Sequence, residues 1–136
     1  MHGAVGRDVS DLAPLPGGAQ FVLASGYPYE FPTFSIATLC ATGFAYAAST
    51  YPTTVAVTPQ RGGLVAGGTS SAYGPDIRLY RTGEATPSRE IEIGSRDMGR
   101  RLAFSPDGTW LYGLATRYPT GPTSSSSRWP TPTCRR

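Results

Sequence analysis

Residues 102–112 read Leu-Ala-Phe-Ser-Pro-Asp-Gly-Thr-Trp-Leu-Tyr: an apolar strand, a turn containing proline and glycine, and a second apolar strand. The same order occurs twice earlier in the chain. Residues 12–16 read Leu-Ala-Pro-Leu-Pro and residues 55–59 read Val-Ala-Val-Thr-Pro, each followed by a glycine-bearing turn and an apolar run. A segment that repeats in this way predicts a structure built from successive similar β-units.

The spacing of the three copies indicates the type of unit. The closing prolines Pro16, Pro59 and Pro106 are 43 and then 47 residues apart, which is typical of a four-stranded β-propeller blade. In the third copy the proline presets φ in the turn, Asp107 tolerates the next position, and Gly108 takes the left-handed one. The two flanking strands are therefore expected to form a hairpin.

Every strand in the prediction is short. In order along the chain, we expect strands at 12–15, 20–25, 34–39, 44–48, 53–58, 64–67, 76–81, 89–93, 101–105 and 110–115. The fold class is thus all-β, with about two and a half four-stranded antiparallel propeller blades and a disordered C-terminal tail. The predicted divisions are a flexible N-terminus (1–7), blade 1 (8–50), blade 2 (51–97), the first hairpin of blade 3 (98–116) and the tail (117–136).

The tail differs in composition from the repeats. Residues 124–127 are four consecutive serines, and prolines and arginines surround them. Such low-complexity sequence cannot bury enough apolar surface to form a core. It stands where the last two strands of blade 3 are expected, which indicates a truncated repeat or a changed reading frame.

Composition excludes several classes of protein. The 136 residues contain 17 Gly and 13 Pro, which disfavour helices. The net charge of +3 comes from arginine alone, and four of the 12 arginines lie in the last twenty residues, so we expect no nucleic-acid partner. No apolar run reaches the roughly 18 residues of a membrane span, and no signal peptide opens the chain. Cys40 and Cys134 either form a disulfide or are separate thiols, and spacing alone does not decide.

The candidate binding residues are tyrosines in the predicted loops between the second and third strands of a blade. Tyr27 and Tyr29 lie in such a loop at 27–31, and Tyr73 lies in the matching loop at 70–75. Tyrosine offers a flat face and one polar tip, which suits stacking on a sugar or holding a peptide. The alternative is that these rings only cover the sheet edges.

Catalytic chemistry finds little support in the sequence. The single histidine, His2, lies near the terminus, and no group of residues has metal-ligand spacing. Glu90 and Glu92 share one strand face opposite Arg78 and Arg81, so we expect cross-strand charge pairs instead of an acid/base pair. We therefore predict a non-enzymatic protein with no catalytic residue, metal or cofactor.

Residues 102–112 resemble the repeat of WD40-like and YVTN-type β-propellers. Residues 76–80 are similar to the third strand of that family, with Tyr80 where WD40 blades often carry Trp. Arg81 replaces the family's Asp, and only one histidine exists, so the hydrogen-bonded tetrad of WD40 blades is not expected. The YVTN type is the nearer resemblance.

A second resemblance is carried by residues 11–18, Asp-Leu-Ala-Pro-Leu-Pro-Gly-Gly, and residues 51–58, Tyr-Pro-Thr-Thr-Val-Ala-Val-Thr. With these features, residues 8–116 also resemble the propeller region of large actinobacterial secreted proteins that carry Ig-like repeats. This resemblance implies a fragment of a secreted or cell-surface scaffold that binds protein or glycan, although the chain as it stands would be cytoplasmic. An open set of blades is expected to self-associate or recruit a partner chain to complete its ring. The alternatives are a piece of a propeller hydrolase or lactonase acting on sugars or lactones, and a degenerate reading frame without selected function.

Overall fold

The computed structural model describes residues 9–70, 74–93 and 96–117. These residues form strands in three antiparallel sheets, and no helix occurs among them. The predicted all-β class is confirmed. Short strands joined by glycine- and proline-containing turns account for this, because such turns interrupt any helical run.

The first two sheets have the same strand order. The first sheet contains, in spatial order, β1 (Val9–Pro14), β2 (Gln20–Ser25), β3 (Glu30–Ser35) and β4 (Ala41–Ala47). The second contains β5 (Tyr51–Val57), β6 (Leu64–Ser70), β7 (Ile77–Arg81) and β8 (Arg89–Ile91). The third consists of β9 (Arg96–Phe104) and β10 (Leu111–Arg117).

The first hairpin of each sheet is built alike. In each hairpin, the residue two positions before the closing proline pairs with the second strand. Pro14 pairs with Phe21, Val57 with Val65, and Phe104 with Leu111. A glycine with positive φ completes each turn, and these are Gly18 at 72°, Gly62 at 69° and Gly108 at 74°. The turn chemistry expected from the sequence therefore operates three times.

The expected strand at 34–39 was wrong. The third strand of the first sheet is Glu30–Ser35, and a turn follows it. Pro32 lies at a register shift between β3 and β4, where a missing N–H is tolerated. Phe31, expected in the loop, is fully buried.

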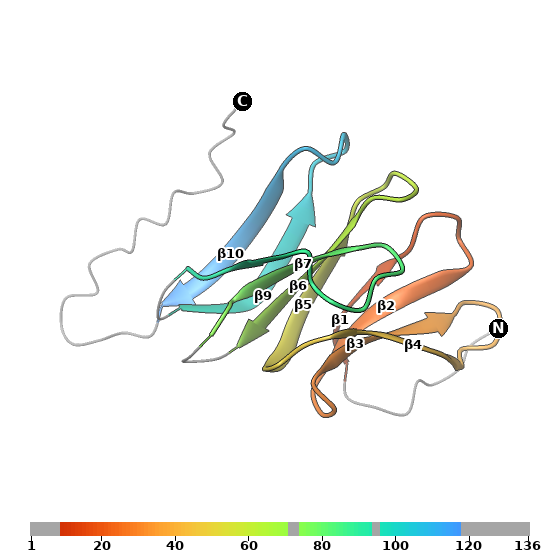
Figure 1. Cartoon of the computed structure of the whole chain (residues 1–136), viewed down its shortest axis with the longest axis horizontal. Coiled ribbons are helices and arrows are strands. Elements are labelled where there is room, and N and C mark those ends of the chain that lie inside the picture. Colours follow the sequence, from red (N-terminus) through yellow and green to blue (C-terminus); the bar gives the residue numbers. More distant parts are fainter. Residues whose placement is uncertain (1–8, 71–73, 94–95, 118–136) are drawn as a thin grey trace.

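The sheets lie side by side in sequence order (Figure 1). β1 contacts β5 and β5 contacts β9, so the first strands of successive sheets are neighbours. The core lies between the sheets and consists of two main layers. Between the first and second sheets it contains Ala13, Leu15, Val22, Ala24, Phe31, Tyr46, Val55, Val65 and Tyr80; between the second and third it contains Ala56, Ala66, Ile77 and Leu102.

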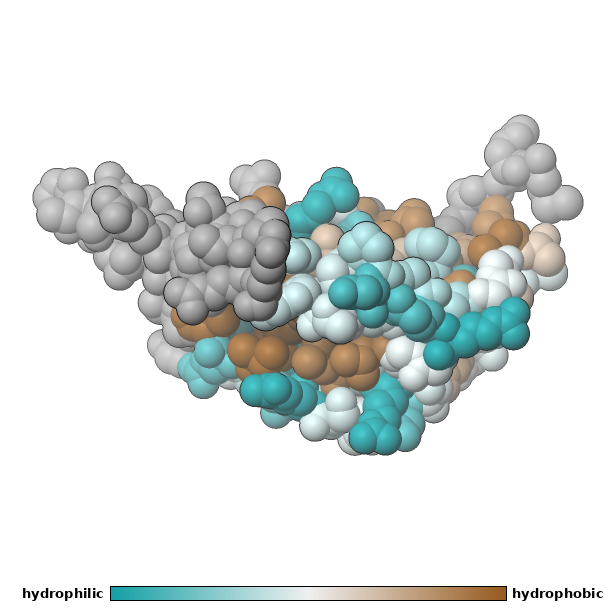
Figure 2. Space-filling view, turned by 90° about the horizontal axis from the view of Figure 1, so that it is seen from above, coloured by the Kyte–Doolittle hydropathy of each residue, from teal (hydrophilic) through white to brown (hydrophobic). Residues whose placement is uncertain are grey.

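In the first strand of each sheet, successive side chains point alternately to the two opposite faces of that sheet. Ala13 of β1 packs toward the second sheet, and Val55 of β5 packs back toward the first. Leu12 stands four residues before its closing proline, as Val55 does. It is 57% exposed because no described sheet precedes the first sheet. Apolar surface of the first sheet is therefore left open. Figure 2 shows a band of apolar residues on the face of the molecule that it presents.

Candidate functional site

Two of the predicted loop tyrosines come together on the surface. Tyr27 and Tyr29 lie in the short connection between β2 and β3, and they are 86% and 47% exposed. Their ring centroids are 6.2 Å apart with planes at 79°, an edge-to-face arrangement. The loop is shorter than predicted, since Glu30 and Phe31 belong to β3. The third predicted tyrosine, Tyr73, lies outside the described residues.

A third ring that sequence reasoning missed extends this pair. Tyr51 is the first residue of β5 in the second sheet and is 45% exposed. Its ring centroid lies 6.2 Å from that of Tyr29, with planes at 60°. Tyr27, Tyr29 and Tyr51 thus form one exposed row across two sheets, here called the tyrosine patch.

Backbone contacts position the loop and the strand end that carry the tyrosine patch. A Cβ on Gly26 would lie 2.8 Å from the Tyr51 hydroxyl and 3.0 Å from its Cε2 and Cζ atoms, so this ring rests directly on the glycine. Pro28, which follows a cis peptide bond, accepts a hydrogen bond from Glu30 N at 2.8 Å. The Tyr29 carbonyl accepts a hydrogen bond from Ala48 N at 3.1 Å, which ties the loop to the end of the first sheet.

The chemistry of the patch is that of aromatic stacking. Each tyrosine presents an apolar ring with a hydroxyl at its tip, so it can contact a C–H face and donate or accept a hydrogen bond at once. Edge-to-face packing leaves ring faces of different orientation accessible to a ligand. A sugar ring or an extended peptide has the matching combination of flat apolar faces and polar groups.

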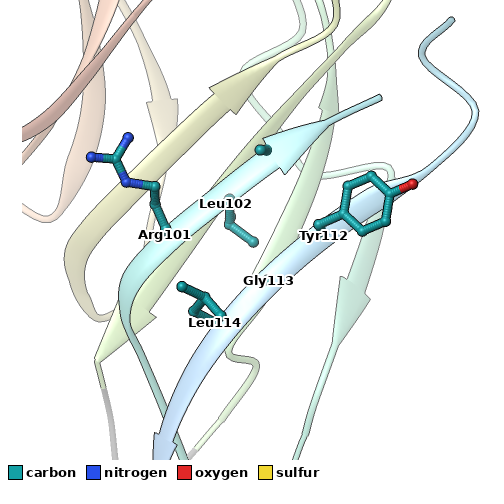
Figure 3. A pocket seen from close by; sticks show the side chains of 6 residues that line it. Arg101, Leu102, Tyr112, Gly113 and Leu114 are labelled. Carbon is teal, nitrogen blue, oxygen red and sulfur yellow. The ribbon is translucent and has the colours of Figure 1, made fainter. Parts of the chain in front are cut away.

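A second surface feature lies on the outer face of the third sheet. Arg101, Leu102 and Ala103 of β9, with Tyr112, Gly113 and Leu114 of β10, line a shallow hollow of about 210 Å³. In Figure 3 the Arg101 and Tyr112 side chains extend to opposite ends of this group, with Leu114 between them. Leu114 is 52% exposed.

Register explains why this face is apolar. Leu114 pairs with Arg101 and Tyr112 with Ala103, just as Ala24 pairs with Asp11 and Val22 with Ala13 in the first sheet. Of the first-sheet residues, Ala13, Val22 and Ala24 are buried against the second sheet. The hollow therefore occupies a face that serves as a packing surface elsewhere in the chain.

The predicted cross-strand charge pair is present between Arg78 and Glu90. The Arg78 Nε donates to Glu90 Oε1 at 3.1 Å, and its Nη2 donates to Ser49 Oγ. Unlike the surface pair expected from the sequence, the Arg78 side chain is only 3% exposed, while Glu90 is about half exposed. Burial raises the pKa of nearby Tyr80 well above its ordinary range, and the Arg78 charge opposes that rise. This cluster links the first and second sheets.

Within residues 9–70, 74–93 and 96–117 there is no group of three or more His, Cys, Asp or Glu that could hold a metal ion. In that part of the chain no helix is long and apolar enough to cross a membrane. Cys40 is an exposed free thiol, and both Cys134 and His2 lie outside the described residues.

Comparison with known proteins gives a likeness in fold. No family model matches the chain, and no curated protein matches it. Among solved structures, Kuenenia stuttgartiensis hydrazine synthase is similar, with a TM-score of 0.65 and 20% identity. The match covers 78% of this chain and 28% of that chain, so this chain spans little more than a quarter of the hydrazine synthase chain.

Proposed function

We propose that this chain is a non-enzymatic binding module that uses the tyrosine patch to hold a ligand with flat apolar faces and hydroxyl or amide groups. A glycan and a peptide both offer that chemistry. The observation that carries the proposal is the exposed row of Tyr27, Tyr29 and Tyr51, whose neighbouring ring centroids lie 6.2 Å apart. Tyrosine residues are frequent anchors of binding sites.

We further propose that the module consists of consecutive blades of a YVTN-like β-propeller from a larger secreted or cell-surface protein. The shared strand order of the first two sheets supports this, as does the repeated hairpin of the third. The apolar outer face of the third sheet also supports it, because its residues match those that are buried against a following sheet. A likeness in fold to part of a longer chain agrees with this proposal.

The test is a binding screen with matched variants. The purified chain would be applied to a glycan array and to a displayed peptide library. Y27A, Y29A and Y51A are expected to weaken binding of the selected ligand about tenfold each, which is the scale of a lost aromatic anchor. W110A is the matched control, because Trp110 is an exposed aromatic residue outside the patch, directly before β10 in the third sheet.

Circular dichroism would verify that every variant retains its strand content. Selection of sugars alone would identify a glycan ligand, and selection of peptides alone a protein ligand. Equal binding by Y27A, Y29A and the unchanged chain would refute the role of the tyrosine patch. Loss of binding in W110A as well would place the ligand elsewhere.

A further inference from the structure

One edge of β10 lacks a neighbour in the described structure. In the first sheet β2 lies between β1 and β3, and in the second sheet β6 lies between β5 and β7. β10 is the corresponding strand of the third sheet, yet among the described residues it pairs only with β9. An open edge presents a row of backbone donors and acceptors that an extended peptide can pair with.

The second sheet shows which backbone groups face that edge. The carbonyl of Leu64 accepts from Thr58 N on the β5 side, and the carbonyl of Gly63 accepts from Thr82 N on the β7 side. In the third sheet the Trp110 carbonyl accepts from Ser105 N, so Trp110 corresponds to Leu64. Because direction alternates along a strand, the N–H and C=O of Leu111 point to the open edge.

The core beneath this edge is incomplete in the same place. Between the first two sheets, Tyr80 of β7 is fully buried, with its ring centroid 6.1 Å from Phe31 and 5.1 Å from Tyr46. Its hydroxyl donates to the Ala47 carbonyl at 2.5 Å. Tyr80 therefore fills the core between these two sheets with a buried aromatic ring.

Among the described residues, the core between the second and third sheets has no buried aromatic residue that corresponds to Tyr80. Tyr80 pairs with Val65, and the residue of β10 that corresponds to Val65 is Leu111. The counterpart of Tyr80 would thus stand opposite Leu111. Leu79, Ile91 and Ile93 pack on this second core but are only partly buried.

We propose that β10 accepts a β-strand from another polypeptide, antiparallel to it, with an aromatic residue opposite Leu111. The first and second sheets define this chemistry, because Phe34 opposite Phe21 and Tyr80 opposite Val65 are both buried aromatic residues. Main-chain hydrogen bonds supply affinity, and the aromatic side chain entering the half-open core supplies specificity. This proposal does not depend on the tyrosine patch.

The test uses the chain's own strand as the probe. A fluorescein-labelled peptide of residues 75–84, which contains β7, would be titrated with the full chain and followed by fluorescence anisotropy. Saturable binding is expected, and Y80A in the peptide should weaken it about tenfold or more. Absence of binding by the unchanged peptide would overturn the proposal.

Backbone methylation gives the matched control. In β7 the Thr82 N–H faces β6 and the Leu79 carbonyl faces β8, so the Tyr80 N–H points to the pairing strand and the Leu79 N–H away from it. N-methylation at Tyr80 should weaken binding about tenfold, whereas N-methylation at Leu79 should change it by less than about twofold. Equal effects of the two methyl groups would contradict strand addition.

Crosslinking locates the bound peptide. A benzophenone amino acid in place of Tyr80 in the peptide should attach near Leu111 or Ile93 of the chain, and attachment to the first sheet would overturn the proposal. The Y27A variant should bind the peptide as the unchanged chain does. If the chain binds no ligand in the screen but binds this peptide, ligand binding at the tyrosine patch is refuted and strand addition at β10 is supported.

Discussion

Asp11 and Thr54 are joined across the first two sheets by a hydrogen bond of 2.8 Å from the threonine hydroxyl to the carboxylate Oδ2. The same oxygen accepts from Val55 N at 3.0 Å. The Thr54 hydroxyl oxygen in turn accepts from Leu102 N in the third sheet at 3.1 Å. One buried hydroxyl therefore links the first strands of all three sheets.

The two residues occupy the same position of the repeat, five before the closing proline. Each lies next to a register shift, between Val9 and Asp11 in the first sheet and between Pro52 and Thr54 in the second. A bulge interrupts regular pairing at that point. The Val55 N–H can therefore bond to the neighbouring sheet instead of its own.

T54V is expected to lower the free energy of unfolding by about 2–3 kcal/mol. Valine keeps the shape of threonine but leaves the Leu102 N–H unpaired in a buried site, and Asp11 loses one donor. Urea unfolding followed by circular dichroism measures the difference. T54S is the control, since it keeps the hydroxyl and loses only a methyl group, at about 1 kcal/mol. A serine variant as unstable as the valine variant would show that packing, not the hydrogen bonds, accounts for the loss.

G67A is expected to destabilise the chain by about 1–3 kcal/mol through overpacking. A Cβ at Gly67 would lie 2.3 Å from Cζ and 2.4 Å from Cε2 of Phe31, a ring fully buried between the first and second sheets. The ring also packs on Tyr80 and cannot withdraw freely. Thermal and urea unfolding of the variant would measure the loss.

A double mutant separates this clash from the general cost of the substitution. In an F31L background the ring that meets the new methyl group is absent, so G67A should cost less than it does alone. The combined loss should then be smaller than the sum of the two single losses. Strict additivity would contradict the assigned contact.

Local turn chemistry made much of the fold predictable. The strand at 20–25 and the turn at 105–108 were expected as observed, because proline, aspartate and glycine impose their conformations without help from distant residues. The third strand of the first sheet was misplaced, since residues 27–31 were expected to form a loop and β3 begins at Glu30. The position of β3 depends on pairing with β4, which follows only after another turn.

The candidate site was predictable only in the part that lies within one loop. Tyr27 and Tyr29 are neighbours in sequence, so a search for loop aromatics found them. Tyr51 reaches them only because β5 packs beside the first sheet and Gly26 leaves room for its ring. Contacts between sheets depend on stacking, which one sequence does not specify at the level of individual side chains.

G26A is expected to weaken ligand binding at the tyrosine patch several-fold while leaving the sheets folded. The added methyl group would overlap the Tyr51 ring, which has Oη 2.8 Å from the Cβ position, and the exposed ring can swing into solvent to avoid it. Binding of the selected glycan or peptide by G26A and by the unchanged chain gives the measurement. In a Y51A background G26A should have no further effect on binding, and a further loss there would place its action elsewhere.

Asp107 is expected to make the third hairpin sensitive to acid. Its carboxylate accepts hydrogen bonds from Ser105 Oγ at 2.5 Å and from Thr109 through N at 3.1 Å and Oγ1 at 2.7 Å. The Ser105 bond, followed by those from Thr109, lowers the pKa of Asp107 from 3.8 to about 2. Because the folded chain holds the proton more weakly than the unfolded chain, the stabilisation is complete above pH 4 and is lost as the pH falls from about 4 to about 2.

Carbon-13 titration of the Asp107 carboxyl would give its pKa directly, and urea midpoints between pH 2 and 7 would give the dependence of stability on pH. D107N cannot ionise, so its midpoint should fall less between pH 4 and pH 2 than that of the unchanged chain. An Asp107 pKa near 4, or equal slopes for D107N and the unchanged chain, would show that these hydrogen bonds do not favour the carboxylate.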